Sequence, residues 1–285
     1  MNSIERVGVV GAGQMGSGIA EVSVKAGADV LVYDTDEKFT ASGQERITGS
    51  LDRAVAKGKL SAEDRDAALG RLRFTTDLAD LADRQLVIEA VVEDEAVKTA
   101  IFAQLDAIVT DPQAVLASNT SSIPIMKIAA ATANPGRVLG LHFFNPVPVL
   151  PLVELVSTLV TDPAAAERVE EFAGHTLGKQ VVKCSDRSGF VVNFLLVPYL
   201  LAAIRMVEAK VATIDDVDKA VVAGLSHPMG PLRLSDLIGL DTLKLIADKM
   251  FDEFKEPLYT APSLLLRMVE AGQLGKKSGQ GFYSY

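Results

Sequence analysis

Short apolar runs alternate with segments of helical periodicity up to about residue 186. Runs rich in β-branched residues, typical of buried strands, occupy residues 7–10, 30–33, 86–92, 114–117, 138–143 and 181–183. Between them, residues 15–26 and 95–109 place apolar side chains three and four positions apart, as one face of a helix requires. Strands that alternate with helices predict an α/β unit with a mostly parallel sheet and right-handed crossovers.

A long charged segment, residues 36–83, separates the second predicted strand from the third. Its helix-forming residues predict two helices joined near residues 58–61. Ser61 is expected to cap the second helix, together with Asp64 at the third position after it. An insertion of this length is expected to project from the sheet as a helical hairpin.

The pattern changes after about residue 186, where the strand signals stop. Helical periodicity predicts helices at residues 189–208, 213–223, 232–254 and 263–271, with prolines and glycines between them. A run of α/β structure followed by a run of helices indicates two domains. We place the mostly parallel α/β domain with its hairpin insertion at residues 1–187 and an all-α domain at residues 188–285.

The composition of the 285 residues is that of a globular protein, with 48% hydrophobic and 23% charged residues. A net charge of −9 repels nucleic acid and anionic membranes, so neither is an expected partner, and an anionic ligand would need a local basic patch or helix N-termini. The single cysteine, Cys184, allows no internal disulfide and is expected to be a small core residue. We recognise no targeting segment or membrane-spanning run and expect a cytoplasmic protein.

Three glycines, Gly11, Gly13 and Gly16, follow the first predicted strand and open the next helix. This strand–turn–helix context is the one that the GxGxxG dinucleotide fingerprint requires. Gly11 allows the tight turn, Gly13 the close approach of a pyrophosphate, and Gly16 the packing of helix on sheet. The motif predicts a Rossmann-like domain that binds a dinucleotide through this turn, which also contains Gln14 and Met15.

The second predicted strand is followed by Asp34, eighteen residues after Gly16. A carboxylate at this place accepts hydrogen bonds from the adenosine ribose and repels a 2′-phosphate, which favours NAD over NADP. NADP stays the alternative cofactor, and Asp36 stays the alternative residue for the ribose contact.

His142 ends one apolar run and Glu154 lies inside another, with a proline-rich link at residues 146–151 between them. A buried carboxylate without a partner is costly, so Glu154 should have one. A histidine backed by a carboxylate is the arrangement for general acid–base chemistry near neutral pH. We therefore expect His142 and Glu154 to be a catalytic pair, whereas His175 and His227 are expected to be surface or structural residues.

A hydroxyl-rich segment, residues 117–122, follows the fourth predicted strand. Because ligands of open α/β sheets bind beyond the carboxyl ends of the strands, a hydroxyl here can bond a substrate oxygen. Ser122 is expected to cap the following helix, but the pattern does not decide which of Ser118, Ser121 and Ser122 contacts the substrate. Neither metal-ligand spacing nor a nucleophile elbow occurs, so we expect no metal site and no hydrolase.

Seven segments occur in order along the chain: GAGQMGSGIA, VIEAVVED, ASNTSSIPI, GLHFFNPVPVLPLVELV, DRSGFVVNFLLVPYL, HPMGPLRLSDLIGLDT and GKKSGQGFYSY. Together they resemble the 3-hydroxyacyl-CoA dehydrogenases, and among these the stand-alone bacterial 3-hydroxybutyryl-CoA dehydrogenases of the actinobacterial type. The resemblance covers nearly the whole chain. It implies an NAD-linked oxidoreductase that interconverts (S)-3-hydroxybutyryl-CoA and acetoacetyl-CoA in fatty acid or butanoate metabolism. The alternative functions are a related sugar-acid dehydrogenase and a dinucleotide-binding sensor without catalysis.

The resemblance also implies roles for particular residues of the active site. The family's catalytic histidine–glutamate pair falls on His142 and Glu154. Its substrate-binding serine falls on Ser121, and the asparagine of its second domain falls on Asn193.

Further contacts implied by the resemblance involve the cofactor and coenzyme A. Glu93 and Lys98 match cofactor-side positions around the nicotinamide ribose. The helical hairpin is implied to hold coenzyme A through Ser50 and a lysine, for which Lys57 is our choice and Lys59 the alternative. The helical domain is implied to serve substrate binding and to form a homodimer.

Overall fold

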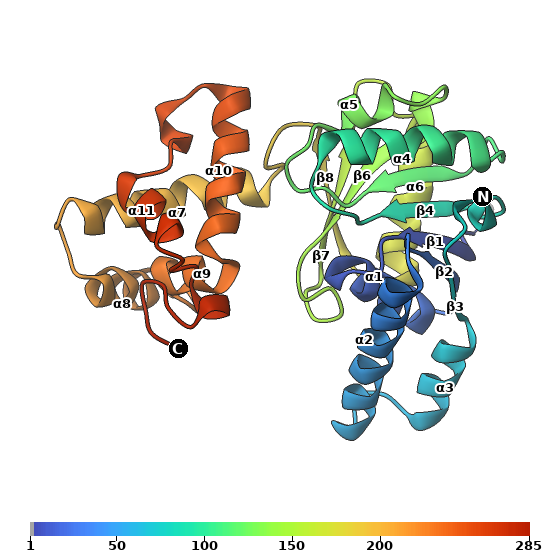
Figure 1. Cartoon of the computed structure of the whole chain (residues 1–285), viewed down its shortest axis with the longest axis horizontal. Coiled ribbons are helices and arrows are strands. Elements are labelled where there is room, and N and C mark those ends of the chain that lie inside the picture. Colours follow the sequence, from blue (N-terminus) through green and yellow to red (C-terminus); the bar gives the residue numbers. More distant parts are fainter. Residues whose placement is uncertain (1–2) are drawn as a thin grey trace. The chain divides into compact units, whose positions relative to one another are not determined.

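The computed structural model describes residues 3–285 (Figure 1). Internal contacts divide it into two compact units, of which the first ends at Arg187 and the second spans Ser188–Tyr285. The structure has α/β elements followed by helices, as the sequence pattern predicted. Every strand of the sheet precedes Arg187, and only isolated bridges follow it. None of the helices in residues 3–285 is long and apolar enough to cross a membrane.

The first unit is built on an eight-stranded sheet with the order β3-β2-β1-β4-β5-β6-β7-β8. Strands β1 to β6 are parallel, β7 runs antiparallel to β6, and β8 is parallel to β7. The predicted mostly parallel sheet is therefore confirmed. The strands are β1 (Arg6–Val10), β2 (Asp29–Tyr33), β3 (Leu72–Thr75), β4 (Leu86–Glu89), β5 (Val115–Ser118), β6 (Val138–Phe143), β7 (Leu152–Ser157) and β8 (Gln180–Ser185).

Helices cover both faces of this sheet, as burial of its central strands on both sides requires. The order of the strands reverses beside β1, since β2 lies on one side of it and β4 on the other. Right-handed crossovers in opposite directions place α1 and α4 on opposite faces. The helical elements of this unit are α1 (Gln14–Lys25), α2 (Glu37–Ala56), α3 (Ala62–Gly70), η1 (Leu78–Leu81), α4 (Glu95–Ile108), α5 (Ile125–Ala129), η2 (Pro135–Arg137), α6 (Pro163–Glu171) and η3 (Phe172–Thr176).

The predicted helical hairpin is present as α2 and α3, which extend away from the sheet in Figure 1. Ser61 caps α3 as expected, because its hydroxyl accepts a hydrogen bond from the backbone N–H of Asp64 at 3.0 Å. The prediction missed β3 at the end of this segment. That strand is the sheet's edge and none of its residues is fully buried, so its sequence lacks the apolar run that identifies a central strand.

The cap of α5 corrects a second expectation. Ser122 was expected to cap this helix, but its hydroxyl donates to Glu93 at 2.9 Å instead. The carboxylate of Asp186 accepts from the backbone N–H groups of Ile125 at 2.8 Å and Met126 at 2.7 Å. A cap supplied from so far along the chain leaves no signal in the local sequence.

The second unit consists of helices packed around its own apolar core, which includes Leu200, Ile204, Leu243 and Leu265. The predicted helix at residues 232–254 is broken in two at Gly239, whose φ of 100° lies outside the range that other residues favour. The elements are α7 (Val192–Glu208), α8 (Ile214–Leu225), α9 (Pro231–Ile238), α10 (Leu240–Phe254), η4 (Pro257–Tyr259), α11 (Ser263–Glu270) and η5 (Lys276–Ser278).

Candidate active site

The turn between β1 and α1 has the geometry of an anion-binding helix N-terminus. Gly13 is the N-cap of α1 and no side chain caps this helix, so the N–H groups of its first turn point to the space beyond it. A Cβ added to Gly16 would lie 1.8 Å from the carbonyl oxygen of Gly11, whereas one added to Gly13 would meet nothing within 4 Å. Gly16 is therefore required by packing, and Gly13 borders open space that a pyrophosphate can enter.

Asp34 lies beside this turn at the end of β2. Its Oδ2 accepts a hydrogen bond from the backbone N–H of Ala12 at 2.7 Å, and its Oδ1 accepts from the N–H of Thr35 at 2.8 Å. Oδ1 also accepts from the hydroxyl of Thr35 at 3.4 Å, whereas Oδ2 can accept a further bond, which a ribose hydroxyl can supply. The alternative, Asp36, is the N-cap of α2, since its Oδ1 accepts from the N–H of Lys38 at 2.7 Å. This geometry favours Asp34 for the ribose.

The two residues between the glycines have different surroundings. Gln14 donates through Nε2 to Oδ1 of Asn145 at 3.1 Å, which connects the glycine turn to the segment after β6. Met15 is partly buried and packs against the core of the first unit. Asn145 was not singled out from the sequence, although it stands directly before the proline-rich link.

Gly13→Ala tests whether the open space at the start of α1 is a dinucleotide site. The added methyl group has room in the protein alone, so the thermal unfolding temperature should stay within a few degrees of the wild-type value. It would occupy the approach of the pyrophosphate, so the Kd for NADH should rise by about tenfold or more. Fluorescence titration measures this Kd. Gly16→Ala is the contrasting variant and should lose stability; unchanged NADH binding by Gly13→Ala would contradict the assignment.

His142 and Glu154 face each other across the antiparallel pair of β6 and β7. The register pairs the two residues directly, which places their side chains on the same face of the sheet. Nδ1 of His142 lies 2.7 Å from Oε2 of Glu154, and the side chains are 8% and 0% exposed. An ionised carboxylate at this distance favours the tautomer with the proton on Nδ1.

Two neighbours hold His142 in place. Oδ1 of Asn119 accepts a hydrogen bond from the backbone N–H of Phe143 at 2.8 Å, which joins the end of β6 to the segment after β5. The ring of Phe144 lies with its centroid 4.5 Å from that of the imidazole. Asn119 lies within the hydroxyl-rich segment. It was missed from the sequence because only hydroxyls were sought there.

Residues of the segment after β5 donate several hydrogen bonds to the carboxylate of Glu93. Its Oε1 accepts hydrogen bonds from the hydroxyl of Thr120 at 2.5 Å, the backbone N–H of Ser121 at 3.2 Å and the hydroxyl of Ser122 at 2.9 Å. Burial alone would raise the pKa of Glu93, but the Lys98 ammonium and these hydrogen bonds outweigh it and hold the pKa below its usual value. The carboxylate is therefore ionised at neutral pH and orders the segment.

The three serines that the residue pattern left as alternatives differ in the hydrogen bonds of their hydroxyls. The hydroxyl of Ser118 donates to Oε2 of Glu89 at 2.6 Å, and that of Ser122 donates to Glu93. Within residues 3–285, the hydroxyl of Ser121 makes no hydrogen bond, and its side chain is only partly buried. The geometry thus favours Ser121 as the hydroxyl available to a substrate.

A buried ion pair lies behind this segment. Nζ of Lys98 is 2.6 Å from Oε1 of Glu89 and 3.4 Å from Oε2 of Glu93. The side chains of Lys98 and Glu89 are 1% and 0% exposed. Lys98 was expected beside the cofactor, and the structure shows that its charge is shared by two carboxylates, of which Glu89 binds Ser118 and Glu93 binds residues 120–122. Glu89 was missed, although a carboxylate that ends an apolar run is the same signal that identified Glu154.

The expected coenzyme A contacts lie on the hairpin. Ser50 is partly buried on α2 beside Glu21, a buried residue of α1 whose pKa burial raises and the Ser50 hydrogen bond partly lowers. Lys57 is the C-cap of α2 and Lys59 follows it, and both are exposed. The local geometry does not favour one lysine over the other.

The remaining expected residues stand on other elements of the chain. Asn193 is buried in the first turn of α7 in the second unit. Cys184 lies in β8, where burial raises the pKa of its thiol to about 12, so it is no activated nucleophile. Among residues 3–285, no group of three or more histidine, cysteine or acidic side chains is arranged to hold a metal ion.

Comparison with known proteins covers almost the entire chain. The model of the 3-hydroxyacyl-CoA dehydrogenase NAD-binding domain matches residues 6–187, and that of the 3-hydroxyacyl-CoA dehydrogenase C-terminal domain matches residues 189–285. The chain is 77% identical to a 3-hydroxybutyryl-CoA dehydrogenase of Mycobacterium tuberculosis over 284 residues, which cover 100% of this chain and 99% of that protein. It is 45% identical to a probable 3-hydroxybutyryl-CoA dehydrogenase of Deinococcus radiodurans, with 98% and 100% coverage.

Solved structures agree with these similarities. The crystal structure of M. tuberculosis FadB2 matches with a TM-score of 0.98 and 77% identity, covering 100% of both chains. The crystal structure of (S)-3-hydroxybutyryl-CoA dehydrogenase PaaH1 from Ralstonia eutropha matches with a TM-score of 0.96 and 40% identity, covering 99% of both chains.

Proposed function

The chain belongs to the 3-hydroxyacyl-CoA dehydrogenase family, and from this premise we propose that it interconverts (S)-3-hydroxybutyryl-CoA and acetoacetyl-CoA. It is an oxidoreductase, and its cofactor is NAD. The observation that carries the proposal is the buried contact of 2.7 Å between His142 and Glu154, because this pair supplies the proton transfer that oxidation of a hydroxyl requires. The names of the similar proteins support a four-carbon acyl group.

The residues of the glycine turn fit the cofactor. The N–H groups at the start of α1 would hold the pyrophosphate, and Asp34 would hold the adenosine ribose. When bound, the nicotinamide accepts a hydride from carbon 3 of the substrate or returns it. Glu93 is the expected contact near the nicotinamide ribose, and Lys98 maintains the ionised state of that carboxylate.

Proton transfer belongs to His142. In the oxidative direction, Nε2 of His142 takes the proton from the 3-hydroxyl of the substrate, and Glu154 stabilises the imidazolium that results. In the reductive direction, the imidazolium gives this proton to the oxygen at carbon 3. The hydroxyl of Ser121 donates a hydrogen bond to a substrate oxygen and so fixes the position of carbon 3. Asn193 is a second proposed donor, on the basis of the family resemblance.

Several finer expectations belong to the proposal as well. Coenzyme A is held by the hairpin through Ser50 and Lys57, the chain forms a homodimer, and the enzyme acts in the cytoplasm in fatty acid or butanoate metabolism. Light scattering of the purified protein tests the dimer. Binding of coenzyme A to Ser50→Ala and Lys57→Ala, with Lys59→Ala as comparison, tests the hairpin contacts and separates the two lysines.

The direct test of the proposed function is an assay with acetoacetyl-CoA and reduced nicotinamide cofactor. NADH absorbance should fall rapidly with the purified protein, and NADPH should be oxidised far more slowly because Asp34 repels the 2′-phosphate. Oxidation with NADPH alone would retain the reaction and overturn the role of Asp34. Oxidation with neither cofactor would overturn the substrate and favour a sugar-acid substrate or a sensor.

A further inference from the structure

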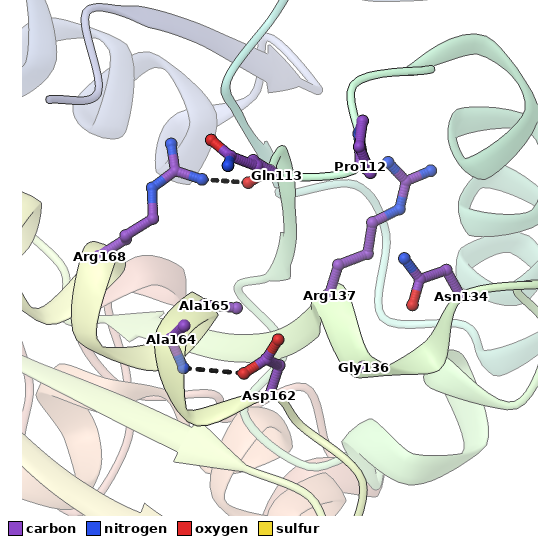
Figure 2. A pocket seen from close by; sticks show the side chains of 9 residues that line it. All are labelled: Pro112, Gln113, Asn134, Gly136, Arg137, Asp162, Ala164, Ala165 and Arg168. Carbon is purple, nitrogen blue, oxygen red and sulfur yellow. Dashed lines mark hydrogen bonds between the residues drawn. The ribbon is translucent and has the colours of Figure 1, made fainter. Parts of the chain in front are cut away.

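Two cavities of the first unit lie outside the residues described above, and their charges differ. Figure 2 shows the cavity between the start of β6 and α6, which is lined by Arg137, Arg168 and Asp162 among others. Arg137 is neutralised there by Asp106, with its Nη2 2.8 Å from Oδ1 of Asp106. Arg168 donates to the backbone carbonyl of Gln113, and Asp162 adds a carboxylate to the lining. The charges in this cavity are mixed, so they favour no one class of ligand.

The second cavity has a volume of about 460 Å³ and lies between the end of α1, the link before β7 and the segment before β8. Its lining contains two lysines and a histidine, Lys25, Lys179 and His175, and no acidic residue. We call it the basic cavity. Its complete lining is Val22, Lys25, Ala26, Pro148, Val149, Leu150, Pro151, His175, Thr176, Leu177, Gly178 and Lys179.

Lys179 is the least solvated of the cations in the basic cavity. Its Nζ donates to the backbone carbonyls of Val147 at 2.6 Å and Leu150 at 2.7 Å, which leaves one of its three N–H groups for another acceptor. Burial and the nearby charge of Lys25 lower the pKa of Lys179. No carboxylate in residues 3–285 lies within 4.0 Å of this ammonium. A partly buried cation without a counter-ion is costly, and an anionic ligand would remove that cost.

Lys25 adds a second uncompensated charge. It is exposed in the last turn of α1 and makes no ion pair with the described residues. It interacts electrostatically with the carboxyl group of Glu21, which is buried, does not line the cavity, and has its pKa raised by burial. His175 and Thr176 add further hydrogen-bonding groups to the lining.

We propose that the basic cavity binds a ligand through its phosphate groups. Two lysines and a histidine line it without an acid, in a chain whose net charge of −9 would otherwise repel an anion. The cavity is open to solvent, so the phosphate groups of a ligand can reach it. The phosphates belong either to coenzyme A of the substrate, which rests on the proposed function, or to a separate phosphorylated metabolite.

Calorimetric titration with inorganic pyrophosphate tests the proposal, with saturating NAD present so that the glycine turn is occupied. The wild-type protein should bind pyrophosphate, and Lys25→Glu should weaken binding by about tenfold or more, because it removes a charge-assisted contact and adds repulsion. Lys25→Gln should weaken binding less. Lys127→Glu is the matched control, since Lys127 is an exposed lysine on α5 paired with Glu95, and it should bind as the wild type does.

Competition with coenzyme A then identifies the source of the phosphates. Displacement of pyrophosphate by coenzyme A, with a raised KM for acetoacetyl-CoA in Lys25→Glu, would assign the basic cavity to the substrate. Binding of both together would assign it to a separate metabolite. Absence of pyrophosphate binding by the folded wild-type protein, or equal binding by wild type and Lys25→Glu, would overturn the proposal. Turnover of acetoacetyl-CoA is measured separately, so failure of the proposed function is recognised independently.

Discussion

His142→Gln should lower kcat for acetoacetyl-CoA reduction by about 10²–10⁴-fold, which is the usual contribution of general acid–base catalysis. Glutamine is chosen because its amide can still donate a hydrogen bond to the buried carboxylate of Glu154 in place of the imidazole. The amide cannot carry a proton to the substrate. KM should change much less than kcat, because the imidazole of His142 acts in the proton-transfer step. Steady-state kinetics with NADH measure both constants.

The control for this variant is His227→Gln. His227 lies in the second unit, and its Nδ1 is 3.5 Å from the hydroxyl of Tyr199. Loss of this contact should leave kcat within about twofold of the wild-type value. Circular dichroism of both variants checks that they are folded. A kcat for His142→Gln close to that of the wild type would refute the proposed acid–base role.

Lys98→Met should destabilise the protein by about 3–5 kcal/mol, the cost typical of removing one partner from a buried ion pair. Glu89 is 0% exposed and bonds Lys98 at 2.6 Å, so the variant would leave a buried carboxylate without its counter-ion. Methionine has a similar length and preserves the packing of the side chain. Chemical denaturation of the wild type and the variant in parallel measures the loss in the free energy of unfolding.

Two further variants separate charge from packing in this prediction. Lys127→Met removes an exposed lysine from its pair with Glu95, so it should cost less than about 1 kcal/mol. Adding Glu89→Gln to Lys98→Met removes the orphaned charge and should recover part of the lost stability. If Lys98→Met were as stable as Lys127→Met, the Glu89 contact would contribute nothing to folding.

Much of the first unit could be predicted because its central strands are buried on both faces. Such strands appear in the sequence as continuous apolar runs, as in β4 and β6. The edge strand β3 has no such run and was missed. The break at Gly239 was missed for another reason, because the apolar periodicity of α9 continues into α10 and only the backbone angle separates them.

Residues of the candidate site also differ in whether the neighbouring sequence is enough to identify their partners. His142 and Glu154 could be paired from the sequence because they stand on two strands joined by a short link. The residue pattern alone did not choose Ser121, which followed from the family resemblance, and the structure adds that Glu89 and Glu93 already bind the hydroxyls of Ser118 and Ser122. Those two carboxylates come from β4 and the turn after it, and no spacing rule connects them with the segment after β5.

The contact between His142 and Glu154 also affects the register of β7 against β6. The inner residues of β7, from Val153 to Val156, are buried on both faces of the sheet. Apolar side chains alone would therefore tolerate a shift of the strand by one residue. Such a slip would move the Glu154 carboxylate to the other face of the sheet and break its contact with the imidazole. The contact between His142 and Glu154 thus favours one register of β6 and β7 over the neighbouring registers, so the two residues proposed for proton transfer also help to specify the fold.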